Sequence, residues 1–464
     1  MGADRVRVEE SRILATCSLG LGFSYRGFRA GLELEPHLIA CDAGSSDFGP
    51  YYLGSGLLQK STVTLKRDLK LLIEGARELG VPFITGSAGG AGADAHVAAC
   101  AELVREIARE SGLSFRMAEI SAQMPRALLK RKLQAGKIRP LGEVPQLTQP
   151  AVDRLSSTVG MMGVEPYIRA LEMGADVIIA GRSTDPAIFA SVALMQGMPP
   201  GQVWHAAKSI DKGYLATTRP QDGSPVLARI HHDHFTVEAT RAGSECTTDT
   251  LAGITLHENP DPYRVAQPTG VIDTQETEYH QIDERTVVVS GSRYLAAETA
   301  TIKLEGAELV GHRRILIAGL RDPRLIARID EFLTAYRSAI AAAAHSMGVE
   351  EASYQLQFRV YGKDAVMGAY EPYADKLGHE LGLIVDVIGK TPEVSGAIAS
   401  RLGGTGTRLA IGGGLGGGGN FAYPFSPSLI EVGPVFEWGA WHLMEVDDGE
   451  LSSLFPITMH DVRP

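Results

Sequence analysis

Three aspartates in the first 200 residues carry the chemistry that this sequence suggests. Asp42 and Asp47 follow the apolar run at residues 38–41. Asp185 follows a second apolar run, at residues 176–180. A carboxylate acts as a general acid or base once burial or a neighbouring like charge raises its pKa. We therefore predict that these aspartates are the catalytic residues of an acid/base site, with helix capping as the alternative role for Asp185.

Small and polar residues surround these carboxylates in the loops that follow strand-like runs. Glycines there leave backbone amides open to a ligand, and a guanidinium group can fork onto a substrate carboxylate. For the arginine, an ion pair with one of the aspartates is an equally open alternative. The predicted substrate-binding residues are Ser45, Ser46, Gly86, Ser87, Gly89, Gly90, Arg182, Ser183 and Thr184.

An alternation of strands and helices must position these loops. Strand-like runs end before small, polar or charged loops five times in the first 200 residues, and helical patterns separate several of them. The strand-like runs lie at residues 12–17, 38–41, 81–85, 113–120 and 176–180. This order predicts a parallel sheet with right-handed crossovers. Because parallel strands share one carboxyl edge, we expect the five loops to meet in a pocket.

The pattern changes after about residue 200, where alternating runs separated by proline and glycine indicate β-rich structure. The predicted class is α/β, with a mostly parallel sheet flanked by helices, a β-rich region and a small α+β domain at the C-terminus. The predicted boundaries are 1–200, 201–350 and 351–464. Residues 136–160 are predicted to be an irregular connection, and 429–435 and 441–446 to be two separate strands.

Charge and cysteine usage restrict the partners and the compartment. The net charge of −11 argues against nucleic acid or an anionic membrane surface. A locally basic site would still accept an anionic small molecule. The four cysteines are widely spaced and form no CxxC pair, so we expect buried free thiols. With a charged N-terminus and no apolar run of ~20 residues, the sequence predicts a cytoplasmic protein.

Three further motifs leave the cofactor question open. Residues 90–95 fit the GxGxxA dinucleotide pattern, but Asp94 would repel a pyrophosphate, so no cofactor is assigned. Residues 231–234 (HHDH) could hold a metal through His232 and His234, yet no further ligand falls at a known spacing, and no metal site is predicted. The glycine run at 412–419 fits a lid, an anion nest or a flexible connection.

Three passages together resemble the acyclic terpene utilisation (AtuA) family. They are residues 167–185, which end in GADVIIAGRSTD, residues 245–253 and residues 256–263. The likeness covers roughly residues 12–320, and residues 431–440 are similar to the small ferredoxin-like domain that accompanies this family. The loop sequences after three strands differ from the motifs usual in the family, so the resemblance implies a divergent subgroup with a different substrate.

The resemblance implies catabolism of branched or carboxylated small molecules, as acids or thioesters. Together with the carboxylates, it favours a lyase of the hydratase or dehydratase type that acts on an anionic substrate, and we expect a homo-oligomer. The alternatives are a hydrolase of a small acyl or amide substrate with Ser46 or Ser87 as nucleophile, a non-catalytic binding or assembly subunit of a catabolic complex, and a nicotinamide oxidoreductase.

Overall fold

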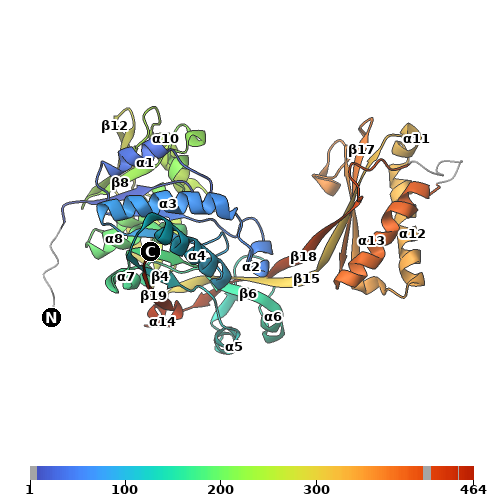
Figure 1. Ribbon diagram of the computed structural model, residues 1–464, viewed down its shortest axis with the longest axis horizontal. Coiled ribbons are helices and arrows are strands. Elements are labelled where there is room, and N and C mark those ends of the chain that lie inside the picture. Colours follow the sequence, from blue (N-terminus) through green and yellow to red (C-terminus); the bar gives the residue numbers. More distant parts are fainter. Residues whose placement is uncertain (1–7, 411–419, 448) are drawn as a thin grey trace. The chain divides into compact units, whose positions relative to one another are not determined.

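The computed structural model describes residues 8–410, 420–447 and 449–464, and the chain divides into two compact units (Figure 1). Unit 1 comprises Met1–Glu308 and Trp438–Pro464, and unit 2 comprises Leu309–Glu437. The division into domains at 1–200, 201–350 and 351–464, expected from the sequence pattern, stays a prediction. The glycine run at 412–419 lies outside the described residues. No helix in the described part of the chain combines the length and the apolar composition needed to cross a bilayer.

A mixed ten-stranded sheet forms the centre of unit 1, in the order β12-β13-β9-β8-β1-β2-β3-β7-β4-β19. The five strands from β1 to β4 in this order are parallel neighbours, and the flanking strands pair antiparallel. The parallel strands are β1 (Ser11–Ala15), β2 (Leu38–Asp42), β3 (Phe83–Gly86), β7 (Val177–Ala180) and β4 (Phe115–Ile120). The α/β class is therefore confirmed, and parallel pairing extends only over these five strands.

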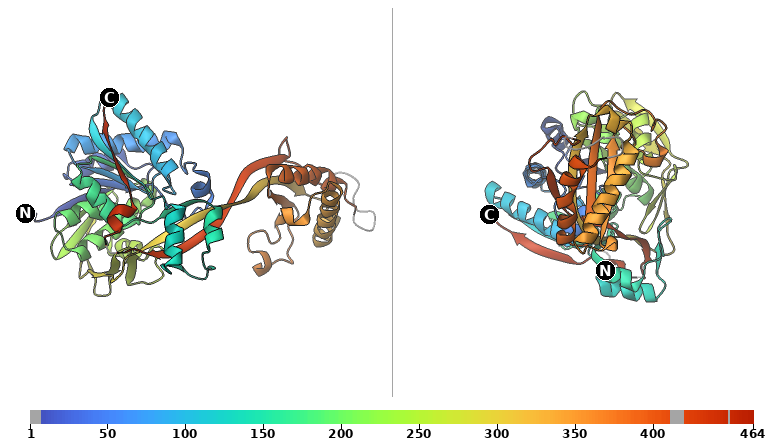
Figure 2. Two further views of the ribbon diagram at one scale, coloured as in Figure 1. Left: turned by 90° about the horizontal axis from the view of Figure 1, so that it is seen from below. Right: turned by 90° about the vertical axis from the view of Figure 1, so that its right-hand side faces the viewer.

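The remaining strands of this sheet come from distant parts of the chain. Four of them follow the helices of the first 210 residues, and β19 comes from the C-terminal end. They are β8 (Val226–Ile230), β9 (His234–Ala239), β12 (Glu278–Asp283), β13 (Thr286–Ser290) and β19 (Ile457–Val462). β19 was not predicted, and it lies beside β4 at one edge of the sheet (Figure 2).

Helices cover both faces of the parallel strands. α3 (Thr62–Leu79) and α4 (Asp94–Ser111) pack on one face in a common apolar core that includes Cys41 of β2. Because successive side chains of a strand point to opposite faces, Asp42 points away from that core. α8 (Asp185–Met195) contacts β1, β2 and β3 on this second face, and α9 (Pro200–Ile210) packs against α8. The carboxylate of Asp42 thus meets the start of α8.

Local signals explain where the two long helices begin and end. The Ser61 hydroxyl accepts a hydrogen bond from the backbone N–H of Thr64 at the start of α3, and Gly80 ends the helix with a φ of +67°. At the start of α4, the Nδ1 atom of His96 accepts a hydrogen bond from the Ala93 amide. His96 is therefore a buried capping residue.

The segment at 136–160 is more regular than the sequence indicated. It contains β5 (Ile138–Pro140), α6 (Gln149–Arg154) and β6 (Leu155–Gly160). β6 pairs with the long strand β15 (Thr301–Leu320), and β5 pairs with β18 (Leu429–Glu445). These strands were missed because their partners lie more than 100 residues away. A separate three-stranded sheet joins β10 (Arg264–Gln267), β11 (Gly270–Asp273) and β14 (Arg293–Ala296).

Unit 2 has the βαββαβ element order of a ferredoxin-like sheet with two helices. After β15 come α12 (Ile329–Ser346), β16 (Tyr354–Tyr361), β17 (Leu381–Gly389), α13 (Pro392–Arg408) and β18. The strand order is β16-β17-β15-β18. β18 is a single strand, so the prediction of two strands at 429–435 and 441–446 was wrong. Correspondence of this unit to the family's accompanying domain stays a prediction.

A close backbone approach holds the loop after β7 against the loop after β3. The Gly92 carbonyl accepts a hydrogen bond of 3.0 Å from the Arg182 amide. Gly92 has a φ of +68°, and a Cβ atom built on it would lie 2.3 Å from the Arg182 nitrogen. Only glycine fits here, so this contact fixes the backbone position of Arg182.

We expect Gly92→Ala to destabilise the protein much more than Gly80→Ala. Both glycines have a positive φ, but nothing lies within 4 Å of a Cβ built on Gly80. The Gly80 variant should lose about 1 kcal/mol for the left-handed conformation alone. The Gly92 variant should lose roughly 2–4 kcal/mol, because the backbone must also move. Urea unfolding measures both values, and equal losses would contradict the argument.

Candidate functional site

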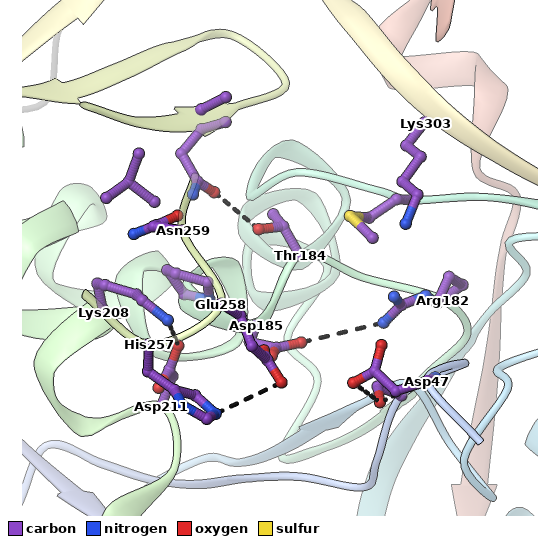
Figure 3. Close-up of a pocket in the computed structure, with 16 residues that line it drawn as sticks. Asp47, Arg182, Thr184, Asp185, Lys208, Asp211, His257, Glu258, Asn259 and Lys303 are labelled. Carbon is purple, nitrogen blue, oxygen red and sulfur yellow. Dashed lines mark hydrogen bonds and ion pairs between the residues drawn. The ribbon is translucent and has the colours of Figure 1, made fainter. Parts of the chain in front are cut away.

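A cavity of about 350 Å³ in unit 1 is lined mainly by polar and charged side chains (Figure 3). Five of the residues predicted from the sequence line it, and they come from the loops that follow β2 and β7. These are Ser45, Asp47, Arg182, Thr184 and Asp185. The remaining charged or aromatic-nitrogen side chains of the lining are Lys208, Asp211, His257, Glu258 and Lys303. The carboxyl ends of two parallel strands therefore contribute to one cavity, as open α/β sheets favour.

Arg182 is already paired inside the protein. Its Nε donates to Glu305 at 3.0 Å and its Nη2 to the other oxygen of that carboxylate at 3.3 Å. Its Nη1 donates to the Ser87 hydroxyl at 3.2 Å. Burial opposes ionisation of Glu305, but the charges of Arg182 and Lys303 outweigh it and hold its pKa at about 2. Arg182 is therefore better described as the ion-pair partner of Glu305 than as a free guanidinium group that awaits a substrate carboxylate.

Asp42 and Asp185 share one lysine. The Nζ atom of Lys212 lies 2.6 Å from an oxygen of Asp185 and 3.7 Å from an oxygen of Asp42. Burial, reinforced by the charge of Asp185, raises the pKa of Asp42 to about 8. Burial acts on Asp185 as well, yet Lys212 and Arg182 outweigh it and lower the pKa of this carboxyl. Near neutral pH the proton of the pair therefore resides on Asp42.

A second lysine–aspartate pair follows from the end of α9. The Nζ atom of Lys208 donates to Asp211 at 3.0 Å, and both side chains line the cavity. Burial raises the pKa of the Asp211 carboxyl. The two residues are three positions apart, which places them on the same side of a helical turn.

Lys303 stands where the charged cavity meets an apolar one. Its Nζ atom lies 2.8 Å from Glu305 and 3.5 Å from the centroid of a Trp441 ring. Burial lowers the pKa of the Lys303 ammonium. A neighbouring cavity of about 240 Å³ shares five lining residues with the first: Met161, Thr184, Ala266, Gln267 and Lys303. Its other walls are Leu141, Pro268, Thr301 and Leu443.

The other predicted residues surround the cavity without lining it. Asp42 is fully buried and reaches Asp185 only through Lys212. Ser46 is buried, and its hydroxyl has no hydrogen-bond partner among the described residues. The Ser183 hydroxyl lies 2.5 Å from the hydroxyl of Tyr167.

The glycine loop after β3 is closely packed. Cβ atoms built on Gly86, Gly89 and Gly90 would lie within 3 Å of neighbouring side chains. Ser87 has a φ of +50°, and its hydroxyl accepts hydrogen bonds from Arg182 and from the Ser183 amide. This loop packs against Arg182 through Ser87, and its glycines do not line the cavity.

Sequence reasoning missed five charged residues of this network. Lys303 and Glu305 lie two positions apart in β15, so their side chains leave the same face of the strand. Lys208, Asp211 and Lys212 follow at spacings of three and one around the end of α9. The KxxDK pattern was a usable signal, whereas nothing local to Glu305 indicates its arginine partner in a loop more than 100 residues earlier.

The histidine pattern and the dinucleotide pattern lie outside this network. His231 and His234 stack with ring centroids 4.5 Å apart, and His232 lies 3.3 Å from the Val8 carbonyl oxygen. The described ranges contain no group of three or more His, Cys, Asp or Glu residues placed to hold a metal ion. Asp94, in the first turn of α4, accepts a hydrogen bond of 2.6 Å from Ser121.

The fold and the cavity define an α/β protein with a charged site at the carboxyl ends of its parallel strands. Residues 62–197 match the model of the family described as acyclic terpene utilisation family protein AtuA. The family assignment made from the sequence is therefore confirmed for this segment, which carries Arg182, Thr184 and Asp185 of the cavity. Comparison with curated proteins and with solved structures gives no match.

We expect Asp42→Asn to change how stability depends on pH. Between about pH 4 and about pH 8 the native Asp42 holds a proton that the unfolded chain releases, so stability falls as pH rises, by about 1.4 kcal/mol per pH unit from this group. An Asn side chain stays neutral and removes this decline. The lowered pKa of Asp185 changes the stability only below the pKa of an aspartate in the unfolded chain, which lies outside this pH window.

Urea unfolding at several pH values from about 5 to about 8 measures this difference. The variant should gain stability relative to the parent protein throughout the window. Parallel curves for the two proteins would contradict the raised pKa of Asp42. Asp94→Asn, an exposed carboxylate at the start of α4, serves as the control and should follow the parent curve.

Proposed function

We propose that this protein is a catabolic enzyme that binds a small carboxylated molecule and moves a proton on it, as a lyase of the hydratase or dehydratase type. The observation that carries the proposal is the Asp42–Lys212–Asp185 arrangement. Two carboxyl groups on one lysine are held in opposite protonation states. Such a pair supplies an acid and a base at the same pH.

Asp185 is the member of this pair that touches the bound molecule, because it lines the cavity. As a carboxylate it takes a proton from a carbon next to the substrate's carboxyl or thioester carbonyl. In the reverse direction Asp185 itself returns the proton to the carbon, and the protonated Asp42, on the other side of Lys212, replaces the proton that Asp185 has given up. Asp42 is therefore a positioning and proton-storing residue, and Asp47 lies at the cavity wall, where a leaving hydroxyl group would meet a carboxyl group.

The cations on one side of the cavity provide a local partner for an anionic ligand. Three cations, Lys212, Arg182 and Lys303, face the carboxyl groups of Asp42, Asp185 and Glu305. With Asp42 neutral, these six groups carry one net positive charge, while Lys208, Asp47, Asp211 and Glu258 add charges of both signs elsewhere in the lining. The lining of the adjoining cavity, largely apolar, suits the hydrocarbon part of the same molecule. This combination agrees with the name of the family, in which acyclic terpenes are used.

The hydrolase alternative has weaker support. A serine nucleophile needs a base within hydrogen-bond reach. In the described part of the chain, the Ser46 hydroxyl has no partner, and the Ser87 hydroxyl bonds to Arg182 and the Ser183 amide. Neither arrangement provides a histidine. No observation favours a non-catalytic assembly subunit over an enzyme.

Branched aliphatic carboxylates and their coenzyme A thioesters should raise the melting temperature, whereas the matched neutral alcohols should not. A ligand at a hundredfold excess over its Kd adds about 2.7 kcal/mol to stability. Lys208→Met should weaken the response to carboxylates, because it removes a cation of the cavity wall. Lys130→Met, outside the cavity, is the control. Equal responses to acids and alcohols would refute a site for anions.

Asp185→Asn and Asp42→Asn should each lower kcat on a substrate found by this screen, by roughly 10²- to 10⁴-fold. Ligand-induced melting shifts should persist in both variants, because the cations of the cavity remain. Asp94→Asn is the matched control and should keep full turnover. An Asp185→Asn variant with parental kcat would remove the basis of the proposal.

A further inference from the structure

Lys303 has the surroundings of a nucleophilic amine. It lines both cavities, so its side chain is accessible to a ligand in either of them. Its side chain extends over the Trp441 ring, with the Nζ atom 3.5 Å from the ring centroid. The amine is therefore held at a fixed position at the boundary between polar and apolar space.

The charge balance at Lys303 differs from that at Lys212. Lys212 faces two carboxyl groups, and the pKa of its ammonium is raised. Lys303 has Glu305 at 2.8 Å, but that carboxylate is also held by two nitrogens of Arg182. Burial is the largest cause of the lowered pKa of Lys303, Arg182 acts in the same direction, and the charges of Glu305 and Asp47 oppose the shift without cancelling it. A desolvated lysine beside another cation is the arrangement that activates amines for attack on carbonyl groups.

We propose that Lys303 forms a Schiff base with the carbonyl carbon of an aldehyde or ketone that also carries a carboxylate. This proposal rests on the proposed function, since the carboxylate is bound by the same cavity. It narrows the substrate class to oxo acids, or to acids that become oxo acids during the reaction. The further reaction of the bound molecule is then proton transfer next to the C=N bond.

The step is balanced without a redox partner. Lys303 first gives one proton to a carboxylate of the cavity, for which Asp47 is available. The nitrogen lone pair adds to the carbonyl carbon, and the oxygen takes up a proton. A second proton moves from nitrogen to this oxygen, which leaves as water while the C=N bond forms. The two protons of the water come from the original ammonium group, and the product is a protonated Schiff base.

The surroundings of Lys303 stabilise this product. The protonated Schiff base keeps one positive charge on the nitrogen, so the contacts to Glu305 and to the Trp441 ring persist. Glu305 stays ionised, because its pKa is about 2. A cation over an aromatic face is favourable when water is excluded.

The test is reductive trapping with 4-methyl-2-oxopentanoate and sodium cyanoborohydride, followed by intact-mass and peptide mass spectrometry. The expected result is one stable adduct per chain, on the peptide that contains Lys303, in about tenfold excess over any other lysine. Lys303→Arg keeps the charge and removes the primary amine, so it should abolish the adduct. Lys66→Arg is the matched control, since Lys66 on α3 pairs with Glu106 and Glu110 on α4 and does not line the cavity.

Thermal shifts with 4-methylpentanoate, which has no carbonyl to condense, separate this inference from the proposed function. If this acid and the oxo acid both bind but no adduct forms at Lys303, the Schiff base is refuted and the carboxylate site stands. If neither acid shifts the melting temperature and no adduct forms, both proposals fail. Equal labelling of many lysines, or labelling that survives Lys303→Arg, also refutes the role of Lys303.

Discussion

The buried ion pair between Arg182 and Glu305 is the interaction on which the candidate site depends. Glu305 is completely buried and Arg182 nearly so, and neither charge could remain there alone. Removing one partner of such a pair typically costs about 3–5 kcal/mol, because the other charge is left without compensation. The pair also joins two distant parts of the chain, since Arg182 follows β7 and Glu305 lies in β15. The loop after β7 and the strand β15 both line the cavity, through Arg182 and Lys303.

The protonation of the whole network follows from this pair. Arg182 takes up both oxygens of Glu305 and lies 4.0 Å from Asp185, so it adds to the charge that keeps Asp185 ionised. Burial already opposes a charge on Asp42, and the ionised Asp185 makes this charge still less favourable, so the Asp42 carboxyl keeps its proton. The asymmetry between two chemically identical aspartates is therefore produced by burial and by their different positions relative to Lys212 and Arg182. It needs no special feature of either aspartate.

The sequence predicted the parallel strands and the loops at their carboxyl edge because those signals are local. Apolar runs followed by small polar residues identify β2, β3 and β7, and caps such as Ser61 and Gly80 fix the helices between them. The cavity residues Asp47, Arg182 and Asp185 were found in this way. The glycine loop at 86–90 was predicted to bind substrate, yet it is closely packed against neighbouring side chains. A glycine-rich turn is equally compatible with close packing of the backbone and with binding of an anion, so the sequence pattern alone did not separate the two roles.

The residues that sequence reasoning missed are those whose roles arise from long-range pairing. Glu305 and Lys303 stand in an alternating strand, and their charges look solvent-exposed until β15 pairs with β6 and β18. The single strand at 429–445 was predicted as two strands separated at residues 436–440, and the structure continues the strand through them. The C-terminal strand β19 has no local signal strong enough to show that it completes the edge beside β4.

The pairing of β15 with β18 links the chemistry of the cavity to the architecture of the chain. β15 carries Lys303 and Glu305 in its first part and then continues into unit 2, and β18 returns from unit 2 before it supplies Trp441. In the sequence, the whole of unit 2 therefore lies between Lys303 and Trp441. Lys303 meets Trp441 because β15 and β18 are neighbours in the sheet, so a single long-range strand pair places the amine against its aromatic ring.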